Sequence, residues 1–76
     1  MSQGAFISIH TATCTEKQVL RAVRAVGAVR HAHIVSGMPD IIAYIEVREF
    51  DMLQGTIDKI RQIEGITKTV TQITLD

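Results

Sequence analysis

The stretch Asp40-Ile41-Ile42-Ala43-Tyr44-Ile45-Glu46-Val47 decides the fold of this chain. β-Branched and aromatic residues dominate it, which predicts a strand over residues 40–47. From position 41 to position 45 the side chains are apolar at both alternating sets of positions. A strand that turns one face to water alternates apolar and polar residues, so this strand is expected to be covered on both sides.

Three more strands are predicted on either side of this one. Residues 5–10, 29–35 and 66–75 are rich in β-branched side chains and are bounded by turn or helix signals. Between the second strand and the central stretch, Ser36-Gly37-Met38-Pro39 is expected to turn the chain, because glycine and proline favour turns.

Two helices are predicted between the strands. Thr15-Glu16-Lys17-Gln18 and Asp51-Met52-Leu53-Gln54 are typical of capping boxes, in which the first side chain caps the helix. Gly27 and Gly65 are expected to end the two helices. The two halves of the chain also match at a constant offset of 37 residues (60 − 23), which pairs Leu20, Val23, Arg24, Val26 and Val29 with Ile57, Ile60, Arg61, Ile63 and Ile66.

These elements follow the order βαββαβ in one domain that spans residues 1–76. Two βαβ units with right-handed crossovers form the ferredoxin-like α+β fold. We therefore expect a four-stranded antiparallel sheet with two helices on one face.

Composition narrows the class of protein. A domain of 76 residues buries only about 60% of the surface that its unfolded chain exposes, so oligomerisation is expected to add stability. The single cysteine, Cys14, excludes an internal disulfide. Eight Lys and Arg balance eight Asp and Glu, which argues against direct nucleic-acid binding. The sequence shows no membrane-spanning apolar run and no secretion signal, so a soluble, cytoplasmic protein is expected.

The face of the sheet that the helices leave open is expected to form a homodimer. If Ile7 and Ile9 face the helices, their neighbours along the strand face away from them. The same alternation on the second strand turns Ala32 and Ile34 inward, although the opposite assignment stays open there. An apolar centre mixed with polar groups suits an interface between copies. The side chains expected on this open face are Phe6, Ser8, His10, Val29, His31, His33 and Val35.

Other candidate sites have simpler structural explanations. His31 and His33 have a spacing used by some zinc enzymes, but no third ligand is evident, so no metal site is predicted. Cys14 precedes the first helix and is expected to pack on Val19 rather than to react. No combination of nucleophile, base and orienting acid and no glycine-rich phosphate loop is evident, so neither catalysis nor a cofactor is predicted. Lys17, Arg21 and Arg24 form a basic stripe that is expected to be solvated.

Residues 29–43 resemble a known family, in the stretch Val29-Arg30-His31-Ala32-His33-Ile34-Val35-Ser36-Gly37-Met38-Pro39-Asp40-Ile41-Ile42-Ala43. It is similar to the second strand, turn and third strand of the effector domain of Lrp/AsnC regulators. The resemblance continues through residues 60–66 and 69–75, so it covers essentially all of residues 5–75. This effector domain is called RAM, for regulation of amino-acid metabolism.

The resemblance implies pairing through the sheets, rings of dimers such as octamers or decamers, and amino-acid binding in clefts between dimers. The family's Gly-x-Tyr-Asp turn falls on Gly37, Met38, Pro39 and Asp40, and its threonines near the start of the last strand fall on Thr69 and Thr71. Pro39 replaces the usual aromatic residue and removes one wall of the cleft. The residue types also suit this role, because turn amides can bind a carboxylate and Asp40 can bind an amine.

The predicted function is therefore that of an amino-acid-binding regulatory and oligomerisation module. Full-length family members also carry a helix-turn-helix domain, which the resemblance does not reach here, so a stand-alone module without DNA binding of its own is expected. Full-length regulators are candidate partners. Two alternatives stay open: a small enzyme of the dimeric α+β barrel type, with an inward-facing His10 or Tyr44, and an assembly module without a ligand.

Overall fold

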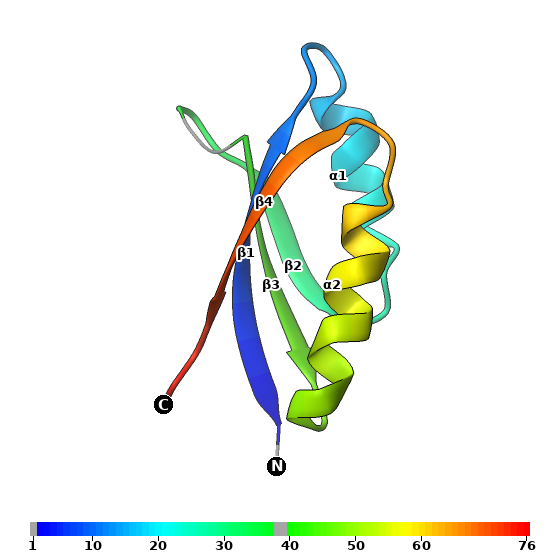
Figure 1. Ribbon diagram of the computed structural model, residues 1–76. Coiled ribbons are helices and arrows are strands. Elements are labelled where there is room, and N and C mark those ends of the chain that lie inside the picture. The colour runs from blue at the N-terminus through cyan, green and yellow to red at the C-terminus, as the bar shows by residue number, and fades with distance from the viewer. Residues whose placement is uncertain (1, 38–39) are drawn as a thin grey trace.

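Four strands form one antiparallel sheet, and both α-helices lie on the same side of it (Figure 1). The computed structural model describes residues 2–37 and 40–76. The order of the strands in the sheet is β2-β3-β1-β4, which confirms the predicted ferredoxin-like fold. The elements are β1 (Gln3–Thr11), α1 (Glu16–Arg24), β2 (Val29–Ile34), β3 (Ile41–Val47), the short 3₁₀ helix η1 (Phe50–Met52), α2 (Leu53–Arg61) and β4 (Ile66–Ile73).

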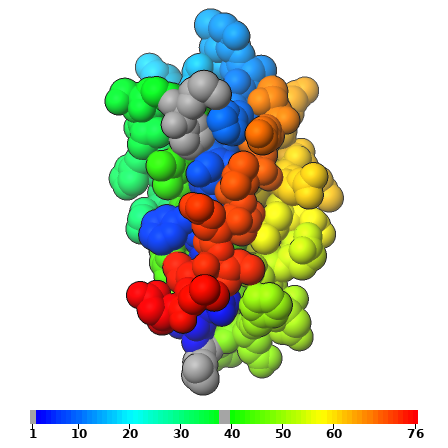
Figure 2. All heavy atoms as spheres, turned by 60° about the vertical axis from the view of Figure 1, so that its left-hand side comes forward, coloured from blue at the N-terminus to red at the C-terminus, as the bar shows by residue number. Residues whose placement is uncertain are grey.

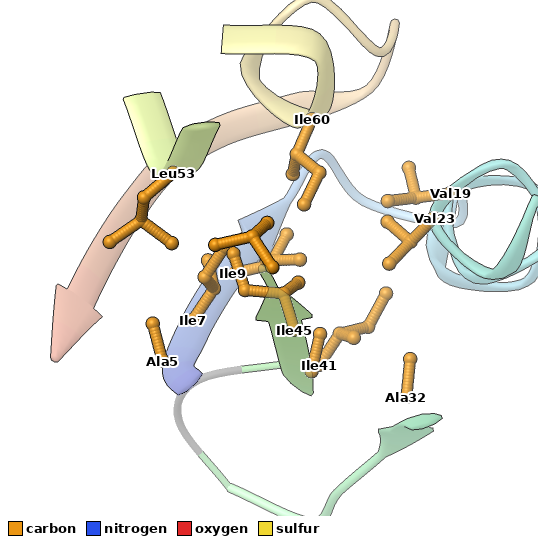
Figure 3. Packing of buried hydrophobic residues seen from close by; sticks show 12 residues of the cluster. Ala5, Ile7, Ile9, Val19, Val23, Ala32, Ile41, Ile45, Leu53 and Ile60 are labelled. Atoms are coloured by element: carbon orange, nitrogen blue, oxygen red, sulfur yellow. The ribbon is translucent and has the colours of Figure 1, made fainter. Parts of the chain in front are cut away.

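The hydrophobic core lies between the sheet and the two helices (Figure 3). Every second residue of β1 and β3 points toward the helices. The fully buried side chains of this set are Ala5, Ile7, Ile9, Ile41, Ala43 and Ile45. Val23 of α1 and Ile60 of α2, which the internal repeat pairs, are both fully buried. The remaining apolar residues of the repeat pack around this centre: Leu20, Val26, Val29, Ile57, Ile63 and Ile66.

The predicted capping boxes are wrong. Thr15 is the N-cap of α1, but its hydroxyl donates to the carbonyl oxygen of Ala12 at 2.7 Å and makes no cap hydrogen bond. The residues from Phe50 to Met52 form a 3₁₀ turn, so α2 begins at Leu53 instead of after Asp51. α1 already ends at Arg24, three residues before the glycine that was expected to stop it.

The direction of Val29 also differs from the prediction. The register between β2 and β3 shifts between Val29 and His31, so Val29 lies opposite the buried Ile45 and packs against the core. After this irregularity the alternation is as predicted: Ala32 faces the helices, while His31 and His33 face away from them. A single extra residue in a strand reverses the direction of the side chains that precede it.

Candidate assembly face and ligand site

The helix-free side of the sheet is a continuous surface of strand side chains, called here the open face. Figure 2 shows β4, in orange and red, running across this surface, with α2 in yellow at its margin. The strand register places eleven side chains on the open face: Phe6, Ser8, His10, His31, His33, Ile42, Tyr44, Glu46, Lys68, Val70 and Gln72.

Four rings form a row across three strands of the open face. The ring centroids of Phe6 and Tyr44 are 4.9 Å apart, and His31 stacks on Tyr44 at 5.5 Å with an angle of 19° between the planes. The centroid of His33 follows at 5.8 Å from that of His31. Gly4 lies under Tyr44, and a Cβ added there would lie 2.7 Å from Cζ of the tyrosine. The glycine therefore lets the tyrosine ring lie flat on the sheet.

Charged groups lie around these rings. The Glu46 carboxylate is 3.4 Å from Nε of Arg30 and accepts a hydrogen bond of 2.9 Å from the hydroxyl of Ser2. Lys68 lies opposite His10 in the register of β1 and β4. Phe6 and Val70, each 43% exposed, lie between these groups. An apolar centre with a polar rim is the usual anatomy of an interface between protein subunits.

The predicted ligand turn is closed by the backbone. The amide of Val35 donates to the carbonyl oxygen of Asp40 at 2.9 Å. Gly37 has a φ of +86°, the left-handed conformation that glycine adopts without strain, and this confirms its expected role in the turn. Met38 and Pro39, the other two residues predicted for the site, lie outside the described residues.

Asp40 has a structural contact that the sequence did not indicate. Its Oδ2 accepts a hydrogen bond of 2.9 Å from the backbone amide of Thr11, and its own amide donates to the carbonyl oxygen of Ile9. An aspartate in a turn commonly accepts hydrogen bonds from amides of its own turn, whereas this carboxylate binds a residue 29 positions away. Thr11 lies at an irregularity in the pairing of β1 with β4, and no local sequence signal marks that position.

The two predicted threonines lie on the other side of β1 from Asp40. Thr69 pairs with Ile9 and Thr71 pairs with Ile7, so both side chains face the helix side of the sheet. Because β1 lies between β3 and β4, Asp40 and Thr69 are separated by two strand spacings, about 10 Å. The hollow that Thr69 lines includes no described residue of the turn.

One hollow of the surface includes a residue of the predicted site, and another lies away from it. Thr69 lines one of about 280 Å³ together with Arg61 and Lys68. A larger hollow of about 500 Å³ lies between the turn after α1, the end of β3 and the first turns of α2. It contains none of the predicted ligand residues, and sequence patterns did not indicate it.

Two of the other candidates differ from the prediction. Cys14 is exposed, which argues against the expected packing on Val19. Arg24 does not belong to a free basic stripe, because its guanidinium donates to the carbonyl oxygen of Ala32 at 2.8 Å.

Within residues 2–37 and 40–76, no three His, Cys, Asp or Glu side chains could share a metal ion. No helix in the same residues is long and apolar enough to cross a membrane.

The sequence comparison identifies the family. The model of the Lrp/AsnC ligand binding domain matches residues 4–76. The chain belongs to the Lrp/AsnC family. It is thus related to a regulatory ligand-binding domain, and the fold found here is the one expected from that membership. Among curated proteins, none matches the chain significantly.

Three solved structures illustrate the similarity of the fold. Protein PHS023 from Pyrococcus horikoshii is 33% identical with a TM-score of 0.89, over 99% of this chain and 90% of that one. AsnC from E. coli is 29% identical with a TM-score of 0.89, and 97% of this chain covers 51% of it. The transcriptional regulator NMB0573 from Neisseria meningitidis, solved in complex with L-Met, is 14% identical with a TM-score of 0.84; 97% of this chain covers 50% of it.

Proposed function

We propose that this Lrp/AsnC domain is an amino-acid-responsive regulatory module that assembles through its open face. The observation that carries the proposal is the match to the family's ligand-binding domain over residues 4–76. The row of rings on the open face supports the pairing, because aromatic side chains are enriched at the centres of interfaces. On this proposal the domain neither catalyses a reaction nor binds DNA by itself, and it acts in the cytoplasm.

The ligand chemistry follows from the turn before β3. The amides of Ser36 and Gly37 donate to no described residue, and we assign them to the carboxylate of the ligand. Oδ2 of Asp40 is held by the Thr11 amide, while Oδ1 accepts from no described residue. The carboxylate can therefore bind an ammonium group while it stays anchored. A carboxylate site and an ammonium site side by side suit a free amino acid, which is the kind of ligand in the NMB0573 complex.

Two copies are needed to complete the proposed site. Within one copy, β1 separates Thr69 and Thr71 from Asp40. We place the turn of one copy, from Gly37 through Met38 and Pro39 to Asp40, against the threonines of a neighbouring copy in a ring of dimers. An octamer or decamer would provide such contacts. Mixed rings with full-length regulators would let the same contact act in transcriptional regulation.

A thermal-unfolding screen against the twenty amino acids, methionine included, tests the ligand. A ligand at about 100 times its dissociation constant stabilises the folded state by roughly 2.7 kcal/mol, which raises Tm by several degrees for so small a domain. We expect such a rise for one or a few amino acids. A flat result with all twenty at millimolar concentration would contradict amino-acid binding and favour an assembly module without a ligand.

Variants of the turn then test the site. Gly37→Val forces a β-branched residue into a left-handed conformation and should abolish the rise in Tm. Gly27→Val is the matched control, because that glycine lies in another exposed turn without a positive φ and a Cβ there meets nothing within 4 Å. Asp40→Asn keeps an oxygen for the Thr11 amide but removes the charge, so it should lose the ligand with a smaller loss of stability than Asp40→Ala. Unchanged affinity in Gly37→Val and Asp40→Asn would contradict the site.

A further inference from the structure

All three histidines of the chain lie on the open face. His10 is on β1, and His31 and His33 are on the edge strand β2. Histidine is the side chain that ordinarily changes its charge between pH 5 and pH 8. The Lys and Arg of the chain equal its Asp and Glu in number, so the side chains carry no net charge while the histidines are neutral. Because all three histidines lie on the open face, the positive charge that they gain on mild acidification is concentrated on this one surface.

The three histidines differ in their charged neighbours. His10 lies between Lys68 on β4 and Asp40, the residue before β3, so a cation and an anion flank it. His31 and His33 lie opposite Tyr44 and Ile42, which are neutral. They also lie next to each other, with ring centroids 5.8 Å apart.

The fixed charges near the His31 and His33 pair do not offset a second positive charge. Glu46 of the open face is already paired with Arg30. From the helix side, the guanidinium of Arg24 reaches β2 and donates to Ala32, midway between the two histidines. Asp40, just before β3, is bound to the Thr11 amide. Protonation of both rings therefore places two like charges side by side with an arginine behind them.

We propose that the His31 and His33 pair makes the association of two copies through the open face sensitive to pH. The inference rests on the pairing proposed above and adds its regulation. When uncharged, the two rings extend the apolar centre formed by Phe6 and Tyr44. In acid, each copy presents up to two added positive charges to a surface that must lose water on pairing, and burial of unpaired charge is unfavourable. Separated copies therefore take up protons more readily, and a fall in pH favours separation.

The test is the dimer dissociation constant at pH 7.5, 6.5 and 5.5, measured by sedimentation at constant ionic strength. EDTA is present throughout, so that no metal ion bridges the histidine pair. Linkage of one proton per dimer changes the constant about tenfold for each pH unit. We expect the constant to rise at least about tenfold from pH 7.5 to 5.5, while circular dichroism shows that the domain stays folded.

Matched variants identify the residues responsible. The double variant His31→Gln, His33→Gln should pair at pH 7.5 and lose most of the dependence on pH. His10→Gln should retain it, because His10 has Asp40 and Lys68 beside it. A dimer equally tight at all three pH values, or a double variant with unchanged dependence, would overturn the inference and leave the pairing intact. A monomer at every pH would overturn the pairing as well.

Discussion

The two faces of the sheet use alternate residues of the same strands for different purposes. On β1, Ile7 and Ile9 face the helices and are fully buried, whereas Phe6, one residue away, is 43% exposed. On β3, Ala43 and Ile45 are buried, whereas Tyr44 lies on the open face as part of a row of rings. One face thus completes the core of a single copy. The other carries apolar surface that only a further molecule can bury, so stability and association should be separable by mutation.

Removal of a side chain from the covered face should have the largest effect. Ile60→Ala deletes three buried carbons at the centre of the core and should lower the free energy of unfolding by about 2–5 kcal/mol. For a domain this small, that loss approaches the whole stability. Urea unfolding at a fixed protein concentration measures it. Leu75→Ala is the control, because Leu75 is 97% exposed, and it should change the free energy by less than about 0.5 kcal/mol.

A change on the open face should act on association instead. Phe6→Ala removes an aromatic contact worth about 2 kcal/mol from each copy, and a two-fold interface counts it twice. The dimer dissociation constant should rise on the order of a thousandfold, as about 4 kcal/mol implies, with little change in the unfolding of the monomer. Phe50→Ala is the matched control, since the chain's other phenylalanine is exposed but lies away from the open face. Equal weakening by both variants would contradict this choice of face.

The covered face could be predicted from the sequence because its signals are periodic. The strand at residues 40–47 and the internal repeat that pairs Val23 with Ile60 could both be recognised because burial selects apolar residues at regular intervals. The structure confirms the strand, whose helix-facing residues are buried, and the burial of both members of the pair. Cover on the second side of β3 stays a prediction. Thr15 is the N-cap of α1 as predicted, but its hydroxyl donates to the carbonyl oxygen of Ala12 and makes no cap hydrogen bond. The predicted start of α2 was wrong, because a 3₁₀ turn precedes Leu53.

The candidate site was less predictable, because it depends on single contacts between distant segments. Thr11 and Asp40 are 29 residues apart and meet through one hydrogen bond that no pattern marks. The irregularity after Val29 reversed one side chain that simple alternation had placed on the open face. The register likewise puts Thr69 on the helix side, a position that propensity alone does not specify. How these residues bind a ligand stays a prediction that depends on contacts between copies.

Substitutions at two crowded glycines, one on each face, should have the smallest effects. They should also separate stability from association most clearly. Gly65 has a φ of +102°, and a Cβ there would lie 2.8 Å from Cγ2 of Val19, a buried core residue. Gly65→Ala should therefore lower the free energy of unfolding by about 1–3 kcal/mol and leave the dimer dissociation constant of the folded protein unchanged. Gly4→Ala collides only with the ring of Tyr44, which can turn away from the sheet.

The Gly4→Ala variant should thus keep most of its monomer stability, within about 1 kcal/mol, and pair about tenfold more weakly because the row of rings is broken. Urea unfolding and sedimentation, applied to both variants, separate the two effects. If Gly4→Ala instead lost stability and paired normally, the tyrosine ring would belong to the fold of one copy. The row of rings on the open face would then stabilise the fold of a single copy, and association would have to use another surface.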